Sequence, residues 1–281
     1  MSYVDFILNL AGLLLWINWR SLPHDPFNKR RPATLVGTLR RAAPSRFRRW
    51  HLLLAIGALL VGRAGFYRLL GPALNWTGRL DLGVITLSFR SDWFDHILLF
   101  SCLSFGFALG VFYACLLLLS SLARPAAAAD HPIHRMVRIQ LGRVENWPRW
   151  AKLISPWIVF ALLWCFLNWW LARMGVIPKP VSMAHRLESA VVIGLGGYLV
   201  WKYLAATLLV LHLLSTYVYF GKNPFWSYVN GQAQSLLAPL EKIPLRVGRV
   251  DFAPVVGIVL VFLLAGAATR GLVWLYARLP L

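Results

Sequence analysis

Six long apolar stretches are the feature that most limits what this chain can fold into. They cover approximately residues 3–20, 50–70, 93–122, 153–173, 187–219 and 254–276. A membrane-spanning helix needs roughly 20 mostly apolar residues, because each residue advances the helix by about 1.5 Å across a hydrocarbon layer of about 30 Å. The sequence therefore predicts an all-α, polytopic membrane protein with about six transmembrane helices.

The composition supports a membrane protein. Hydrophobic residues make up 59% of the 281 residues and charged residues only 14%, far from the composition of a soluble domain. The 29 Lys and Arg outnumber the 10 Asp and Glu, which in a soluble protein would indicate nucleic acid binding. Here the basic residues lie mainly between the apolar stretches, so we expect a bilayer with anionic headgroups as partner and no nucleic acid.

A short proline-containing pattern that recurs along the chain predicts three degenerate repeats. A proline followed by an apolar residue comes after each odd-numbered stretch, and a linker then leads to the next stretch. The expected helix-start motifs contain Asp25 and Pro26, Asp130 and Pro132, and Asn223 and Pro224. At such a start, proline loses no hydrogen bond and Asp or Asn can cap free amides. We expect repeats at about residues 1–91, 92–184 and 185–281, each holding one helix pair.

The linkers inside the three repeats are richer in Lys and Arg than the loops on the other side. This bias predicts cytoplasmic linkers and outside termini. In the middle linker, apolar residues recur at helical spacing: Ile133, Met136, Val137, Leu141 and Val144. Charged residues and a histidine occupy the other faces: His134, Arg135, Arg138 and Glu145. We expect amphipathic helices in the membrane interface, serving either as a platform for lipid or partner or only to set topology.

Acidic residues open the odd-numbered stretches, and arginines lie near the ends of the even-numbered ones. The acidic residues are Asp5, Asp95 and Glu188, and the arginines are Arg63, Arg173 and Arg270. An arginine in hydrocarbon costs at least about 2.5 kcal/mol unless it is paired or reaches the interface. We hypothesise that an intramembrane ion pair helps to hold the two helices of each repeat together.

Lys202 lies deep in the fifth stretch, where an ionisable residue is a candidate functional site. His212 follows on the same stretch, and the two could form a polar path. No Asp or Glu lies deep in any stretch, so a proton relay has no obvious carboxylate. The alternative is structural, with Asn168, Thr207 and His212 satisfying the ammonium group.

Residues 222–254 carry three motifs of a known family. Its motifs are Asn223-Pro224-Phe225, Leu237-Ala238-Pro239-Leu240 and Gly248-Arg249-Val250-Asp251-Phe252-Ala253-Pro254. This stretch resembles the YggT family of integral membrane proteins, with Ala238 in place of an acidic residue and Ala253 in place of a serine. The resemblance implies helix starts at Asn223-Pro224 and Asp251 to Pro254, a bacterial cytoplasmic (inner) membrane location and a role without a defined reaction.

The sequence lacks the usual signs of an enzyme or cofactor site. We find no nucleophile elbow, phosphate-binding loop or cluster of metal ligands, so no catalytic residue, metal or cofactor is expected. The leading expectation is a non-catalytic membrane accessory or scaffold subunit that assembles with another membrane protein complex. The alternative is a small-solute or anion transporter or channel, with Lys202 and Arg63 lining its path.

Overall fold

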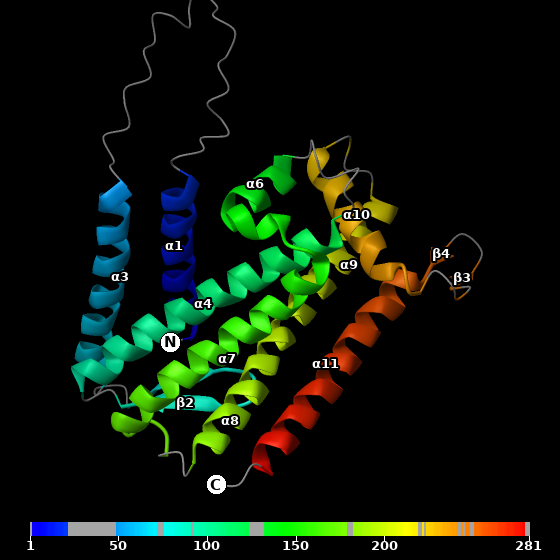
Figure 1. The fold of residues 1–281 in the computed structure, drawn as a ribbon. Coiled ribbons are helices and arrows are strands. Elements are labelled where there is room, and N and C mark those ends of the chain that lie inside the picture. Colours follow the sequence, from blue (N-terminus) through cyan, green and yellow to red (C-terminus); the bar gives the residue numbers. More distant parts are fainter. Residues whose placement is uncertain are drawn as a thin grey trace, which may run out of the picture. The chain divides into compact units, whose positions relative to one another are not determined.

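The computed structural model is built mainly from helices (Figure 1). It describes residues 2–21, 49–71, 76–90, 93–123, 132–178, 182–218, 221, 223–240, 243, 245–247 and 250–278. The longer helices are α1 (Ser2–Ser21), α3 (Arg49–Leu70), α4 (Phe94–Leu122), α7 (Arg149–Arg173), α8 (Met183–Gly196), α9 (Trp201–Tyr217) and α11 (Ala253–Ala277). The shorter helices α6 (Pro132–Leu141) and α10 (Pro224–Leu237) precede α7 and α11 along the chain.

Five helices among the described residues are long and apolar enough to cross a membrane. They are Trp50–Leu70, Phe94–Leu122, Arg149–Arg173, Met183–Tyr217 and Ala253–Ala277. The fourth joins α8 to α9 through a 3₁₀ turn, η3 (Gly197–Val200). The prediction of a helical membrane protein is therefore confirmed. Helix α1 covers the first apolar stretch with 20 residues but is not one of the five, so the sixth span stays a prediction.

The chain forms two compact units. One contains Met1–Trp76 and Arg90–Ala108, and the other contains Thr77–Phe89 and Leu109–Leu281. This division falls within α4, whereas the predicted repeats divide the chain near residues 91 and 184. A compact unit reflects packing and a repeat reflects correspondence between sequences, so the repeats remain a prediction.

In the first unit, α1 packs against α3 and approaches the first half of α4 closely. A Cβ atom added at Gly12 of α1 would lie 2.7 Å from the ring of Phe105, so the two helices meet where one has no side chain. Ser101 Oγ of α4 donates a 3.0 Å hydrogen bond to the carbonyl oxygen of Leu60 in α3. These contacts bring the three helices together.

In the second unit, glycines let α7 pack closely against α8 and η3. A Cβ atom at Gly194 would lie 2.9 Å from the carbonyl oxygen of Trp157, and one at Gly197 would lie 2.6 Å from the ring of Phe160. The indole Nε1 of Trp157 also donates a 3.3 Å hydrogen bond to the carbonyl oxygen of Val191. The α7–α8 contact thus depends on small residues, as is common where helices associate in membranes.

Helix α9 packs against both α10 and α11. Leu209, Ala233 and Leu237 form a buried apolar cluster at this junction. The start of α9 is tied to the second half of α4, because Trp201 Nε1 donates a 3.0 Å hydrogen bond to the carbonyl oxygen of Ala114.

Two short hairpins interrupt the helices and were not expected from the sequence. Strand β1 (Gly78–Asp81) pairs with β2 (Thr86–Phe89), and β3 (Arg246–Val247) pairs with β4 (Val250–Asp251), both antiparallel. In the first turn Gly83 has φ of 84°, which favours glycine, and its amide donates a 2.8 Å hydrogen bond to the Asp81 carboxylate. Burial alternates along β1 and β2, so period-two hydrophobicity was the available signal.

We expect Gly194→Leu to destabilise the second unit, because the new side chain would push α7 away from α8. Overpacking of this kind costs about 1–3 kcal/mol. The free energy of unfolding in detergent would measure the loss. The matched control is Gly266→Leu on α11, where a Cβ atom meets nothing within 4 Å. Equal stability of the two variants would contradict the role of Gly194.

Candidate functional site: two polar networks and an apolar groove

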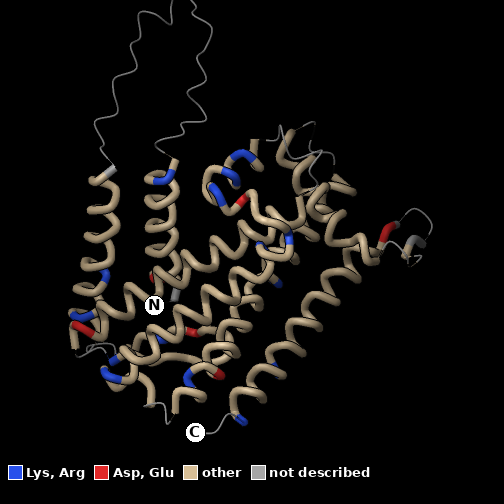
Figure 2. The backbone as a smooth tube through the Cα atoms, viewed as in Figure 1, with Lys and Arg blue, Asp and Glu red and all other residues tan. Residues whose placement is uncertain are grey.

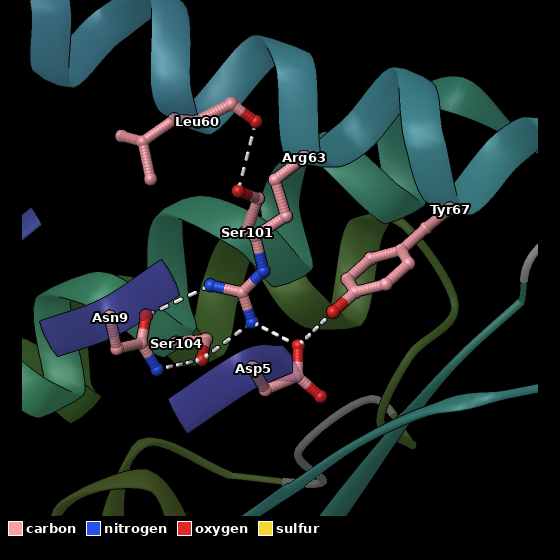
Figure 3. A network of polar contacts seen from close by, with 7 residues as sticks. All are labelled: Asp5, Asn9, Leu60, Arg63, Tyr67, Ser101 and Ser104. Atoms are coloured by element: carbon pink, nitrogen blue, oxygen red, sulfur yellow. Dashed lines mark hydrogen bonds and ion pairs between the residues drawn. The ribbon is translucent and has the colours of Figure 1, made fainter. Parts of the chain in front are cut away.

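The first polar network surrounds Arg63 of α3, whose side chain is fully buried (Figure 3). Its Nη2 lies 2.6 Å from Oδ1 of Asp5 in α1. Its Nη1 donates a 2.9 Å hydrogen bond to Oδ1 of Asn9, and Nη2 also donates to Oγ of Ser104 in α4 at 3.1 Å. One guanidinium group therefore joins α3 to α1 and to the first half of α4.

Helical spacing brings the partners of Arg63 together. Asp5 and Asn9 lie four residues apart on α1, as do Arg63 and Tyr67 on α3, and residues so spaced share one face of a helix. The hydroxyl of Tyr67 donates a 2.6 Å hydrogen bond to the same oxygen of Asp5 that accepts from Arg63. Asn9 Nδ2 donates to Ser104 Oγ at 3.0 Å. The Asp5 carboxylate thus receives two short hydrogen bonds and neutralises the buried cation.

The pair expected in the first repeat is present, but the other expected pairs are not observed among the described residues. There, Arg173, Glu188 and Arg270 are exposed and take part in none of the ion pairs. Arg173 instead lies 5.4 Å from the ring centroid of Trp169. An exposed arginine near a helix end can reach the headgroups and needs no internal carboxylate. Asp95 likewise has no ion pair with a described residue.

The second polar network surrounds Glu145, in the short 3₁₀ helix η2 (Gly142–Asn146) between α6 and α7. Its Oε2 accepts a 2.6 Å hydrogen bond from Oγ of Ser120 in α4. Lys152 Nζ donates to the same hydroxyl at 2.7 Å and lies 3.7 Å from Glu145 Oε1. Nε2 of His134 in α6 lies 3.4 Å from that oxygen. The chain can turn back here because Gly142 has φ of 58°, a conformation that favours glycine.

This network corrects the expected orientation of the middle linker. His134 and Glu145 were expected on outward faces, yet His134 is buried and the Glu145 side chain is only 11% exposed. Met136 lies on the apolar face that was expected to meet the membrane, and it is exposed within the chain. The inward face of α6 consists of His134, Val137, Gln140 and Leu141. Buried polar groups require partners, and Glu145 and Lys152 supply charges that a pattern of hydrophobic residues does not reveal.

Tyr228 of α10 lies close enough to Glu145 to be affected by its charge. Burial, and to a smaller extent the negative Glu145 carboxylate, raise the pKa of Tyr228 to about 12. Both effects disfavour the phenolate. The electrostatic environment of the second network therefore includes α10 as well as α4, α6 and α7.

The expected helix-start motifs are partly within the described residues. The Asn223 side chain accepts a 3.0 Å hydrogen bond from the amide of Phe225, and α10 begins at Pro224. Asp251 accepts a 2.9 Å hydrogen bond from the amide of Ala253, where α11 begins, with Pro254 next. Helix α6 begins at Pro132. Asp25, Pro26 and Asp130 lie outside the described residues.

An apolar groove of about 690 Å³ lies between α8–α9 and α11, with Lys202 in its lining. The lining is otherwise almost entirely apolar; on α11 it includes Val261, Leu264, Ala265, Ala268, Gly271 and Leu272. The Lys202 ammonium lies 4.9 Å from the ring centroid of Tyr203. Among the described residues it has neither a carboxylate partner nor a hydrogen-bond acceptor.

Two of the three polar neighbours proposed for Lys202 bond elsewhere. His212 Nδ1 lies 2.9 Å from Oδ1 of Asn230, and Thr207 donates to the carbonyl oxygen of Tyr203 at 2.7 Å. The structural explanation in which Thr207, His212 and Asn168 satisfy the ammonium group is therefore wrong for Thr207 and His212. Lys202 and His212 do not form a joint hydrogen-bonded path within the described residues.

The described part of the chain contains no group of three or more His, Cys, Asp or Glu side chains that could hold a metal ion. Charged residues are sparse along the long helices, as in the stretch of α11 before Arg270 (Figure 2).

Comparison of the chain with protein-family models, curated proteins and solved structures finds no match.

We expect Arg63→Met to lower the free energy of unfolding by up to about 3–5 kcal/mol, because the Asp5 carboxylate, only 20% exposed, would lose its cation. Adding Asp5→Leu should recover part of the loss, and a double-mutant cycle in detergent would measure the coupling. The control Arg173→Met removes an exposed arginine and should change stability by less than about 0.5 kcal/mol. Equal stability of the two arginine variants would contradict the stabilising role of the Arg63–Asp5 pair.

We expect stability to decline above pH 10 partly through Tyr228. Free tyrosine ionises near pH 10 and folded Tyr228 near 12, so its stabilising contribution is complete below about pH 10 and is lost as pH rises toward 12. Comparing the pH dependence of unfolding with that of Tyr228→Phe should reveal a smaller decline in the variant. Tyr217→Phe, which alters an exposed side chain, is the control and should follow the unmodified protein.

Proposed function

We propose that this chain is a non-catalytic accessory or scaffold subunit that assembles with another membrane protein complex. The observation that carries the proposal is the open apolar surface of α11. Only 6% of the most apolar segment of α11 is buried within the chain, whereas 17–33% of the corresponding segment is buried in the other four candidate spans. A helix that its own chain covers so little offers a long surface to lipid or to another transmembrane helix.

The state of the buried cations also supports a scaffold. Arg63 and Lys152 each lie within 4 Å of a carboxylate from their own unit. Networks of this kind hold helices in one arrangement, which suits a subunit that presents a fixed surface. A transport path needs charged groups that stay accessible to a solute, and the Arg63 side chain is fully buried.

The proposed setting is the bacterial cytoplasmic membrane, with α1 as a sixth span and the basic linkers on the cytoplasmic side. Exposed Arg135 and Arg138 on α6 suit contact with anionic headgroups. The capped starts of α10 and α11 are compatible with the YggT-like motifs in residues 222–254, and we propose membership of that family on those motifs.

A small-solute or anion transporter is the second candidate, because Lys202 lines a groove without a described counter-charge. In a transporter, that ammonium would attract an anion within the membrane. Its surroundings are almost entirely apolar, which suits an apolar surface of a partner better than a hydrated ion.

Purification from native membranes in mild detergent would separate the two candidates. We expect the chain to elute with another membrane protein in a complex of fixed stoichiometry, and reconstituted chain alone to show no anion flux. A protein that elutes alone and carries an anion flux lost in Lys202→Met would contradict the scaffold and favour transport. Arg173→Met, which removes an exposed cation outside the groove, is the matched control.

A further inference from the structure

Among the described residues that line the groove between α8–α9 and α11, one is a cation and the others are almost entirely apolar. This combination limits what can occupy the groove. Besides Lys202, its lining from α8, η3 and α9 consists of Leu195, Tyr198, Leu199, Trp201 and Ala205. An apolar occupant would cover these surfaces but leave the ammonium uncompensated, at a cost of at least about 2.5 kcal/mol if it is embedded. A complementary occupant is therefore apolar along its length and carries one negative group.

The depth of Lys202 indicates where that negative group must be. The continuous helix Met183–Tyr217 has 35 residues, and Lys202 lies about 28 Å from its first residue and about 22 Å from its last at roughly 1.5 Å per residue. A hydrocarbon layer of about 30 Å centred on this helix places the Cα atom of Lys202 near mid-membrane. Lipid phosphates lie at the interface, so this position favours a carboxylate within a transmembrane segment.

A second copy of the chain offers no suitable carboxylate. In the described candidate spans, acidic residues are confined to Asp95 and Glu188, near the first residues of their helices, and Asp5 holds the same position in α1. Asp5 is already paired with Arg63. An acidic group opposite Lys202 would therefore come from a different protein.

The shape of the groove suits a helix. Along α11 it extends from Val261 to Leu275, about 21 Å at roughly 1.5 Å per residue, which covers most of the hydrocarbon layer. Its lining includes small residues on both sides: Ala265, Ala268 and Gly271 on α11, and Ala205 on α9. Small residues let a neighbouring helix backbone approach closely.

We propose that the groove receives a transmembrane helix of another membrane protein, and that an aspartate or glutamate near the middle of that helix pairs with Lys202. The proposal rests on the accessory role and specifies its contact surface. The pair forms in the middle of the membrane, so it selects a partner helix by the position of its carboxylate.

A synthetic helix tests this directly. The full chain is reconstituted in phosphatidylcholine vesicles with a dansyl-labelled, tryptophan-free Leu/Ala transmembrane peptide that carries one central glutamate, and energy transfer from the protein's tryptophans reports binding. We expect the glutamate peptide to bind about tenfold more tightly than the same peptide with glutamine. Lys202→Met should remove that preference, and Lys202→Glu should transfer it to a peptide with a central lysine.

The controls distinguish the occupant. Arg173→Met should keep the preference for glutamate, since Arg173 lies outside the groove. Equal binding of the glutamate and glutamine peptides, or binding of neither, would overturn the proposal. A lipid occupant would also overturn it. In that case brominated phosphatidylglycerol would quench tryptophan fluorescence in a way that depends on Lys202, and the glutamate peptide would not bind.

The peptide-binding experiment tests the groove contact separately from the purification from native membranes, which tests the accessory role. A complex that survives purification while the glutamate peptide shows no preference would leave the accessory role standing and overturn the groove contact. Binding of the glutamate peptide by a chain that elutes alone from native membranes would support the contact and contradict the accessory role.

Discussion

A buried cation inside a bundle of apolar helices needs a negative partner supplied by the protein itself, because lipid tails cannot solvate it. The contact between Arg63 and Asp5, at 2.6 Å, meets this requirement in the first unit. Asn9, Ser104 and Tyr67 add further hydrogen bonds around the pair. The positions of α1, α3 and the first half of α4 are therefore coupled: none can shift without breaking a bond to a buried charge.

The same constraint organises the second unit at a different place. Glu145 neutralises Lys152 and joins α4 to α7 through the hydroxyl of Ser120. Around this network the helices pack through small residues, such as Gly194 and Gly197 against α7. Charge pairing selects which helices meet, and the absence of side chains at the glycines sets how closely they pack.

Lys202 differs from these cations because no described residue of its own chain balances its charge. Lys202 lies in an apolar groove beside α11, most of whose surface the chain leaves uncovered. The unbalanced charge and the uncovered apolar surface therefore lie next to each other. One acidic transmembrane helix would satisfy both. In the accessory role proposed here, the chain would contribute the arrangement of its surfaces and would need no catalytic group.

The sequence by itself determined the helical membrane class and the places where α10 and α11 begin. These features depend on local properties: the length of an apolar stretch, and the ability of Asn223 and Asp251 to cap amides two residues ahead. The Asp5–Arg63 contact could also be predicted from the sequence. An arginine in an apolar stretch needs a carboxylate, and few acidic residues lie in or near the apolar stretches.

Only the tertiary structure decided which other polar residues face inward. His134 and Glu145 looked like outward residues because helical periodicity records hydrophobicity and not pairing. Ser120 and Lys152 lie 25 residues before and 7 residues after Glu145, and no periodic pattern links those positions. The groove beside Lys202 likewise depends on how α8, α9 and α11 pack, and the two hairpins depend on pairing between strands too short to be stable alone. Such features arise from contacts between distant parts of the chain, which a linear pattern does not specify.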